Sequence, residues 1–244
     1  YLVWTIIYLP YTAIQVHNGA SILRWIFDCF FNGSYYHLWF LPALMLSVLI
    51  VYMLYLKLGM RKSLILCGLL YLIGAAVNGY GDVLTQIPFI GSAISLYLKV
   101  FTTPRNGIFF GPIFILLGAL LQRAPIRSKK EYALGIGISY ALLLGEQGII
   151  WASGNMHDLT SMYVMMVPLI YFLVSALLQV RALATPLHHF LRQSSQLIYV
   201  SHILFAMPLL SLLGTHHLLV YVIVLIASQL LAALIILLSR RFSW

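Results

Sequence analysis

Four ionisable side chains stand inside or at the ends of long apolar stretches, where an ionised group is costly and therefore calls for a reason. They are His37, Arg105, Glu146 and His202. His37 precedes an apolar stretch, and Trp39 follows it two residues later. A neutral imidazole at a sheltered position can accept the proton of a substrate hydroxyl, which is the general-base role. The alternative is a belt of interfacial aromatic residues, which accounts for the rings around His37 but not for the histidine.

Glu146 and Arg105 are expected at similar depth in their apolar stretches. A carboxylate at that depth needs a cationic partner or a watery cavity, or else it stays protonated. An Arg105–Glu146 ion pair is one arrangement that meets this need. In the alternative, Arg105 extends to lipid headgroups and Glu146 is a neutral hydrogen-bond donor between helices.

His202 and Tyr199 are three residues apart, so a helix would place both on one face. A lone histidine on a helix more often forms a hydrogen bond between helices than acts in catalysis. The other histidines and the two cysteines do not have the spacing of a metal site or of a disulfide framework. We therefore expect no metal site.

Composition restricts the class of protein. Hydrophobic residues make up 62% of the 244 residues, and charged residues make up 8%. A soluble domain carries about 25% charged residues, and even a large soluble core could not bury this much apolar surface. The sequence therefore predicts a polytopic membrane protein. Its net charge of +9 does not indicate a nucleic-acid partner, because the basic residues lie in short segments between apolar stretches.

Eight apolar stretches approach the length of roughly 20 residues that a helix needs to cross a bilayer. They cover about residues 1–16, 38–56, 63–79, 107–122, 132–152, 159–180, 195–214 and 217–239. No repeat and no flexible linker divides them. We therefore predict an all-α bundle of about eight membrane-spanning helices, forming one domain over residues 1–244.

Basic residues alternate between the segments that join these stretches. One set of segments carries eleven of the fourteen Lys and Arg residues: Lys57, Arg61, Lys62, Arg123, Arg127, Lys129, Lys130, Arg181, Arg192, Arg240 and Arg241. The other set carries only Arg24, Lys99 and Arg105. By the positive-inside rule the first set is cytoplasmic, which predicts that residue 1 and the C-terminus both lie on the cytoplasmic side.

Two segments on the predicted outer side are not simple loops. Residues 21–31 are apolar around Arg24 and Asp28, which are four apart and can pair on one helix face. Residues 82–101 are apolar but interrupted by Pro88 and Gly91. We predict that both lie at the interface or re-enter it rather than span the membrane.

Three stretches together resemble the acyltransferase-3 family: HLWFLPALM at 37–45, RNGIFFGPIFILLGALL at 105–121 and SSQLIYVSHILF at 194–205. Members of that family are bacterial integral membrane proteins of about ten spanning helices. They typically transfer an acyl group from cytoplasmic acetyl-CoA to hydroxyls of sugars or other cell-envelope molecules. The family also includes the membrane domains of membrane-bound serine racemases, for which serine uptake is proposed.

The resemblance implies roles for individual residues. His37 would support catalysis on the acceptor side. Substrate binding is implied for the other matching positions, and Glu146 joins them on the depth argument: Trp39, Arg105, Asn106, Glu146, Tyr199 and His202.

The sequence departs from the family pattern at its start. Family members begin with a helix that carries an arginine and, further along, a histidine, and this pair is assigned to catalysis. Residues 1–10, YLVWTIIYLP, resemble the third helix of the family instead. Two preceding helices would then be missing from this sequence, and an even number agrees with the predicted cytoplasmic start. His37 is accordingly expected to be a supporting residue beside a catalytic pair that this chain does not contain.

The resemblance implies a membrane O-acyltransferase in the bacterial cytoplasmic membrane. It would move an acyl group, with acetyl expected, from acyl-CoA to a hydroxyl of an envelope polysaccharide or a peptidoglycan-related acceptor. Acyl-CoA is the donor substrate, with its phosphates near cytoplasmic cations such as Arg181 and Arg192, and no bound cofactor is expected. Membrane lipid is the remaining expected partner. The alternatives are a transporter for serine or a similar small solute, and a membrane domain attached to a soluble racemase.

Overall fold

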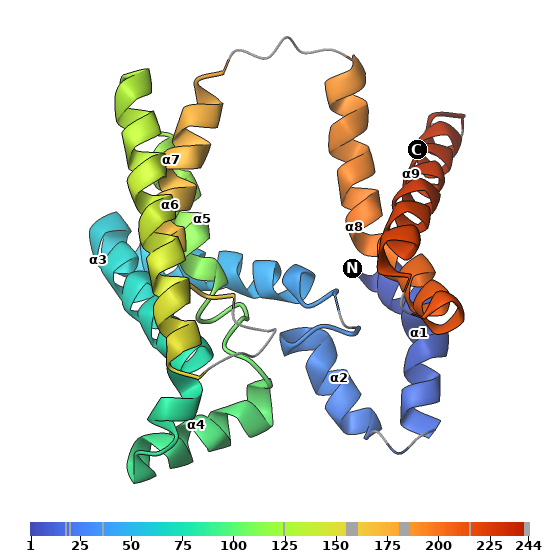
Figure 1. The fold of residues 1–244 in the computed structure, drawn as a ribbon, viewed down its shortest axis with the longest axis horizontal. Coiled ribbons are helices and arrows are strands. Elements are labelled where there is room, and N and C mark those ends of the chain that lie inside the picture. Colours follow the sequence, from blue (N-terminus) through green and yellow to red (C-terminus); the bar gives the residue numbers. More distant parts are fainter. Residues whose placement is uncertain are drawn as a thin grey trace. The chain divides into compact units, whose positions relative to one another are not determined.

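The computed structural model describes residues 1–17, 19, 21–35, 37–123, 125–154, 161–180, 186–214 and 216–241. Within these residues every regular element is an α-helix (Figure 1), which confirms the predicted all-α bundle. The helices are α1 (Leu2–His17), α2 (Ile22–Phe31), α3 (Phe40–Leu84), α4 (Pro88–Phe101), α5 (Gly111–Leu121), α6 (Lys129–Ala152), α7 (Met166–Leu178), α8 (Pro186–Leu213) and α9 (His217–Arg241).

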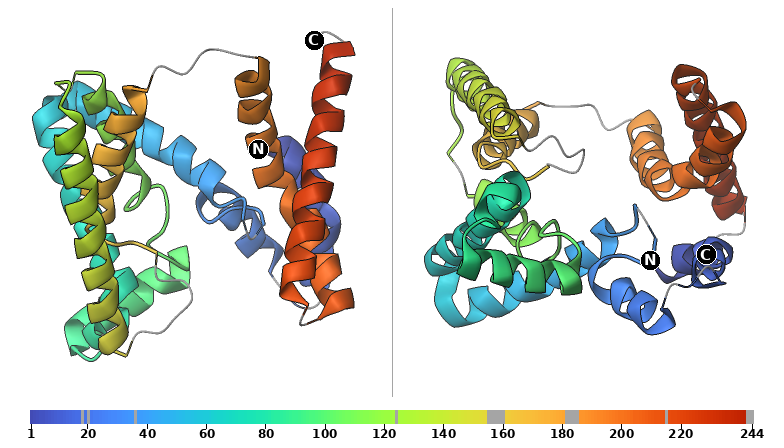
Figure 2. Two further views of the ribbon diagram at one scale, coloured as in Figure 1. Left: turned by 45° about the horizontal axis from the view of Figure 1, so that its top comes forward. Right: turned by 60° about the horizontal axis from the view of Figure 1, so that its bottom comes forward.

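The helices belong to two compact units, residues 1–181 and residues 182–244. In the first unit, α5 packs against α3 and α7, and α6 packs against α7. The second unit is the pair α8 and α9, which lie side by side (Figure 2). Whether the whole chain is one domain stays a prediction.

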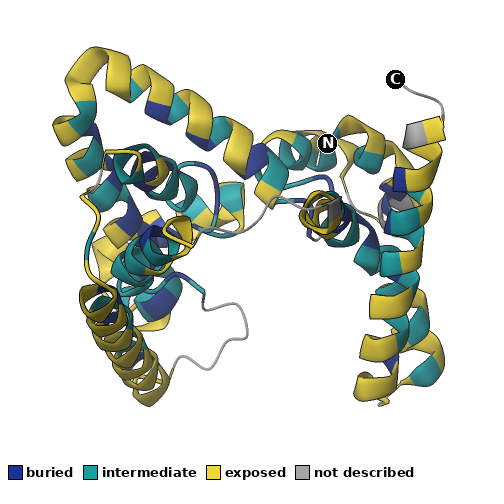
Figure 3. Cartoon of the chain, turned by 90° about the horizontal axis from the view of Figure 1, so that it is seen from above, coloured by how far each residue is buried: buried dark blue, intermediate teal, exposed yellow. Residues whose placement is uncertain are grey.

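Four helices of the described residues are long and apolar enough to cross a membrane: Phe40–Leu84, Lys129–Ala152, Leu187–Leu213 and His217–Ser239. Their large apolar side chains are widely exposed, for example Leu218 at 79% and Leu230 at 65% on α9. Figure 3 shows exposed residues along most of the helical surface. Soluble proteins rarely expose apolar surface on this scale, whereas helices in lipid must.

Helix α3 contains two of the predicted spans, 38–56 and 63–79, without the loop expected between them. Between these two spans the helix breaks at one residue, Gly59, with φ 72° and ψ 172°. A positive φ of this kind is accessible to glycine at little cost. The basic residues on either side of Gly59 are helical. The predicted loop was therefore wrong, because one glycine suffices to turn the chain.

Two other predicted spans are shorter than expected. The stretch 107–122 becomes α5, with 11 residues, and the stretch 159–180 becomes α7, with 13 residues. Non-helical residues 102–110 and 161–165 precede these two helices, and residues 159 and 160 lie outside the described residues. Conversely, α8 begins at Pro186 instead of residue 195. Arg192 therefore lies in a helix, and its assignment to a segment between two helices was wrong.

Small residues bring the start of α5 against the first arm of α3. Gly107 and Gly111 have the four-residue spacing of the GxxxG packing motif. A Cβ at Gly111 would lie 1.9 Å from Ser47 Oγ, and one at Gly107 would lie 2.6 Å from the carbonyl oxygen of Ala43. Ser47 Oγ donates toward the Ala43 and Gly107 carbonyl oxygens, at 2.7 and 3.1 Å. This contact fixes the segment that carries Arg105 beside the start of α3.

The predicted Arg24–Asp28 pair is confirmed, with Nε 3.1 Å from Oδ1. Arg24 also donates to the carbonyl oxygen of Lys99 and to Thr102 Oγ1, each at 2.8 Å. These are acceptors at the C-terminal end of α4, where a cation is favourable. Arg24 therefore joins α2 to α4. The predicted interruption at Pro88 is also confirmed, since α4 begins there.

Candidate functional site

Three non-helical segments come together where α3, α5 and α7 begin. They are residues 32–35 with 37–39, residues 102–110, and residues 161–165. Arg105 belongs to the second segment, and its side chain contacts the first and the third. Its guanidinium carbon lies 4.8 Å from the centre of the Trp39 ring, which is a cation–π distance. Its Nη1 donates to Ser161 Oγ at 3.2 Å. Arg105 is thus the residue at which the three segments meet.

The guanidinium of Arg105 retains hydrogen-bonding capacity. Its Nε is buried and has no hydrogen-bond partner among the described residues. A guanidinium carries five N–H donors in a fixed planar fork. A buried donor without a partner costs about 1–3 kcal/mol, so an oxygen-rich ligand at this position would recover that cost.

The backbone around Trp39 is tightly held. Gly33 adopts φ +95°, and a Cβ there would lie 2.4 Å from the Trp39 backbone nitrogen. The indole ring meets Phe110 and Phe40 edge to face, with centroid distances of 6.0 and 6.1 Å. Trp39 therefore offers a fixed aromatic surface to the guanidinium of Arg105.

Asn106 organises the segment in front of α5. Its Oδ1 accepts from the backbone N–H groups of Ile108 and Phe109, at 2.9 and 3.2 Å. Its Nδ2 donates to Tyr97 Oη and to the Thr103 carbonyl oxygen. Burial raises the pKa of Tyr97 to about 12, so the phenol stays protonated and donates to the Thr103 carbonyl oxygen. Asn106 is 2% exposed, and its amide uses both acceptor and both donor positions within the protein.

We expect Asn106→Ala to destabilise the protein by about 3 kcal/mol, because several buried hydrogen-bonding groups lose their partner. The measurement is the thermal midpoint in detergent, with the exposed Gln122→Ala as control. An unchanged midpoint together with a raised KM would contradict this expectation and favour the predicted substrate contact.

Two side chains of α3, far away in the sequence, hold the backbone of residues 161–165. Asn78 Oδ1 accepts from the N–H groups of Ser161 and Met162, both at 2.9 Å. Tyr71 Oη donates to the Tyr163 carbonyl oxygen at 2.8 Å. Non-helical backbone within a membrane is tolerated only where protein or water satisfies it. Here the protein satisfies it, and the Met162 side chain is fully buried.

Glu146 completes this arrangement at the start of α7. Its Oε1 accepts from the Val164 N–H at 2.7 Å and its Oε2 from the Met165 N–H at 2.9 Å. A carboxylate at a helix N-terminus is favourable because it meets free N–H groups and the positive end of the helix dipole. The Arg105–Glu146 ion pair, one of the two arrangements considered, does not form. In the other arrangement Glu146 donates a hydrogen bond, whereas here both of its oxygens accept one. Backbone N–H groups occupy the carboxylate instead.

His37 lies in a cluster of aromatic rings. It is 6% exposed, and its ring meets Tyr8 of α1 edge to face, with a centroid distance of 5.2 Å. Tyr8 in turn stacks on Tyr35 at 4.7 Å. Burial, and then the nearby Tyr11, raise the pKa of Tyr35. The cluster therefore keeps an uncharged, aromatic surrounding around the imidazole, and its role on the acceptor side stays a prediction.

Tyr199 and His202 lie on α8, in the second unit. Their ring centroids are 6.4 Å apart, which confirms the shared helix face. His202 Nδ1 lies 2.8 Å from the Tyr199 carbonyl oxygen and 3.1 Å from that of Ile198, so this nitrogen carries the proton and donates within its own helix. Substrate binding by these two residues stays a prediction.

Sequence reasoning missed four residues that shape the site: Tyr71, Asn78, Tyr97 and Ser161. Asn78 offered a signal, because it is an amide within the apolar stretch 63–79. Polar residues in such stretches tend to face the protein interior. Tyr71 offered a weaker signal of the same kind, because its hydroxyl lies at the middle of that stretch. Tyr97 offered none, since tyrosine is common near membrane interfaces.

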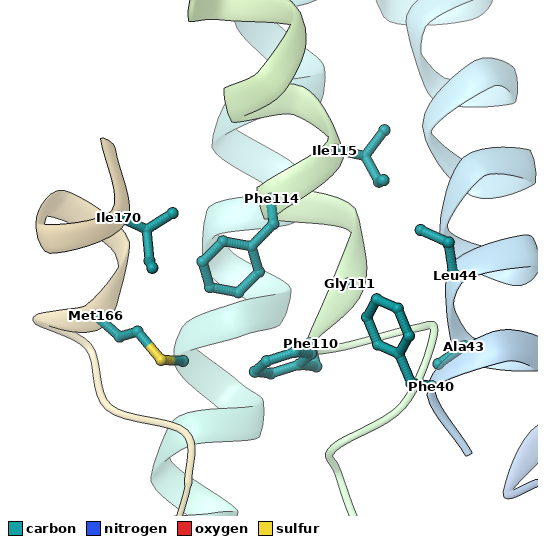
Figure 4. A pocket seen from close by; sticks show the side chains of 9 residues that line it. All are labelled: Phe40, Ala43, Leu44, Phe110, Gly111, Phe114, Ile115, Met166 and Ile170. Atoms are coloured by element: carbon teal, nitrogen blue, oxygen red, sulfur yellow. The ribbon is translucent and has the colours of Figure 1, made fainter. Parts of the chain in front are cut away.

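An apolar groove of about 310 Å³ lies between the same three helix starts (Figure 4). Phe40 and Leu44 of α3 stand on one side, and Met166 and Ile170 of α7 on the other. Phe110 and Phe114, at the start of α5, lie between them. Phe40 and Phe110 also contact Trp39, so the groove borders the Arg105 site.

Comparison with known proteins identifies the family. An acyltransferase domain model (acyltransferase 3) matches residues 1–237. An amino-acid racemase of Enterococcus faecalis is 30% identical over 189 residues, which are 74% of this chain and 26% of that protein. A serine/alanine racemase of Enterococcus gallinarum is 31% identical over 183 residues, 73% of this chain and 26% of that protein. The chain thus spans about a quarter of the length of these relatives. No solved structure matches. The family model covers nearly the whole chain, and the chain therefore belongs to the acyltransferase 3 family of membrane proteins.

Proposed function

We propose that the chain transfers an acyl group, with acetyl expected, from cytoplasmic acyl-CoA to a hydroxyl of a cell-envelope acceptor in the bacterial cytoplasmic membrane. The observation that carries the proposal is Arg105. Its guanidinium lies over Trp39 and keeps a buried Nε–H that has no partner among the described residues. Family membership supports acyltransferase chemistry in general, and Arg105 supplies a place for an oxygen-rich acceptor.

In the proposed reaction, the acceptor hydroxyl oxygen attacks the thioester carbonyl carbon. The new C–O bond forms, the C–S bond breaks, and CoA leaves as a thiol with the proton of the hydroxyl. Arg105 would bind an oxygen of the acceptor and orient it, which is the contribution of positioning residues. The buried surroundings of Arg105 would keep water from competing with the acceptor.

His37 would support the acceptor side, as the resemblance implies. His37 and its ring neighbour Tyr35 lie in the same segment, residues 32–35 with 37–39, that carries Trp39. Tyr199 and His202 are proposed as further substrate contacts. The C-terminus is proposed to be cytoplasmic, following the distribution of basic residues.

Serine transport is a second candidate, because one observation favours it. Residues 102–110 and 161–165 are non-helical and lead into the short helices α5 and α7. Transporters use such broken helices to bind small solutes. The relatives named racemases are compatible with this candidate and with a membrane domain attached to a soluble racemase.

The test places the protein in liposomes with radiolabelled acetyl-CoA on one side and a mixture of hydroxyl acceptors on the other. We expect label to reach the acceptors. We expect Arg105→Ala to reduce the rate about 100-fold, which corresponds to about 2.7 kcal/mol of lost transition-state binding, and His37→Ala to reduce it less.

The control is Arg127→Ala, which removes a guanidinium from a ring contact with Phe172 outside the site. Label that stays on CoA while radiolabelled serine accumulates on one side would overturn the proposal in favour of transport. If Arg105→Ala and Arg127→Ala lowered the rate of acyl transfer equally, Arg105 would have no specific role in the mechanism.

A further inference from the structure

The apolar groove and the Arg105 site adjoin each other, and together they have the chemistry of an amphiphile. The groove lies between the starts of three helices, and its six principal side chains are all apolar: Phe40, Leu44, Phe110, Phe114, Met166 and Ile170. Trp39 connects the two regions, because it contacts Phe40 and Phe110 of the groove and also Arg105. An apolar binding surface is therefore continuous with a cation.

The volume of the groove limits what it can hold. A cavity of about 150 Å³ accepts one benzene molecule, so a groove of about 310 Å³ corresponds to about twelve carbon atoms. An acetyl group is far too small to fill it. A linear hydrocarbon segment of this length fits in volume and matches the apolar walls.

The charge at the end of the groove favours an anion. The N-terminal ends of α3 and α5 lie at the Arg105 site and carry partial positive charge, while the N-terminal end of α7 is already bound by the Glu146 carboxylate. Arg105 adds a full positive charge, with a buried Nε–H that no described residue accepts. Glu146 is the acidic side chain bound there, and its two oxygens are occupied by the N–H groups of Val164 and Met165. Arginine suits phosphate because its planar fork matches two oxygens.

We propose that the groove binds the hydrocarbon chain of a phosphate-bearing membrane lipid, with the phosphate at Arg105, and that this lipid carries the acyl acceptor. The inference rests on the proposed function, since it names the class of acceptor. A lipid-linked acceptor would reach the site by diffusion in the membrane, with its hydroxyl group held near Trp39.

The binding test uses dodecyl phosphate and uncharged dodecanol as probes. The protein is purified in a nonionic sterol-based detergent, which offers no linear chain to the groove. We expect dodecyl phosphate to bind with a Kd about tenfold lower than that of dodecanol. In Arg105→Gln the two probes should bind equally.

Leu44→Trp and Ile170→Trp fill the groove from opposite walls and should each weaken dodecyl phosphate binding about tenfold or more. The matched control is Leu49→Trp, on the same arm of α3, where Leu49 is 58% exposed and outside the groove. Thermal midpoints equal to the wild type show that the variants fold. Binding that survives both groove-filling substitutions would overturn the proposal, as would equal binding of the two probes to the wild type.

The liposome assay separates this inference from the proposed function. Acyl transfer without dodecyl phosphate binding would support the proposed acyltransferase function and overturn the proposal that the acceptor is linked to a lipid. Dodecyl phosphate binding without acyl transfer would overturn the assignment of the lipid as acceptor, because no acyl group would then reach the bound lipid.

Discussion

Gly111→Val is expected to separate the start of α5 from the first arm of α3 and to abolish acyl transfer. A Cβ at Gly111 would lie 1.9 Å from Ser47 Oγ and 2.8 Å from Ser47 Cβ. Ser47 is fully buried, and its hydroxyl is held by the Ala43 and Gly107 carbonyl oxygens, so it cannot turn aside. Overpacking of this kind costs about 3 kcal/mol, and here it also displaces Arg105 from Trp39.

The same helix offers a matched control. Gly118 is exposed, and a Cβ there would meet nothing within 4 Å. Gly118→Val makes the same change of residue without the steric conflict. We expect a large fall in the thermal midpoint for Gly111→Val and little change for Gly118→Val. Equal midpoints for the two variants would show that the close approach of α3 and α5 does not support the fold.

A double substitution tests the cause of the effect. Ser47→Gly removes the atoms that a side chain at Gly111 would meet. Combined with Gly111→Ala, it should restore part of the stability that Gly111→Ala alone removes. Residues in direct contact show such coupling, whereas independent residues show additive effects.

Hydropathy predicted the class of fold because few backbone conformations are stable in lipid. Backbone groups in hydrocarbon must be satisfied within the segment, so long apolar stretches are helices. The stretch 217–239 accordingly matches α9 within two residues. The Arg24–Asp28 pair was predictable for a similar reason, since its four-residue spacing is local to one helix.

The breaks in front of α5 and α7 were not predictable from hydropathy. Residues 161–165, SMYVM, are as apolar as a spanning helix. Their backbone is satisfied by Asn78 and Tyr71, which are 83 and 92 residues away from their partners Ser161 and Tyr163. A hydropathy window of about 20 residues contains none of these partners, so hydropathy predicts a helix for this segment.

The site was predictable in part. The resemblance selected Trp39 and Arg105 from separate stretches, and the structure places them in contact. The Arg105–Glu146 pair, which similar depth had made possible, does not form, because depth says nothing of the backbone groups around the carboxylate. The backbone N–H groups of Val164 and Met165, at the start of α7, donate to the Glu146 carboxylate instead.

Glu146→Ala is expected to loosen the segment 161–166 and the start of α7. The substitution leaves the Val164 and Met165 N–H groups without their acceptor. An unsatisfied buried N–H costs about 1–3 kcal/mol, so we expect a loss of about 3 kcal/mol for the pair. Amide hydrogen exchange in residues 161–166 should rise, while exchange in α9, which belongs to the second unit, should not change.

Two further variants serve as controls for the exchange measurement. Gln147→Ala changes the exposed neighbour of Glu146 and should leave exchange at 161–166 unaltered. Glu146→Gln keeps one acceptor oxygen and should give an intermediate rate, because its amide NH₂ cannot accept from the second N–H. If Glu146→Ala instead raised KM while exchange stayed at the wild-type level, the carboxylate would belong to substrate recognition. The helix start would then be held by Asn78 and Tyr71 alone.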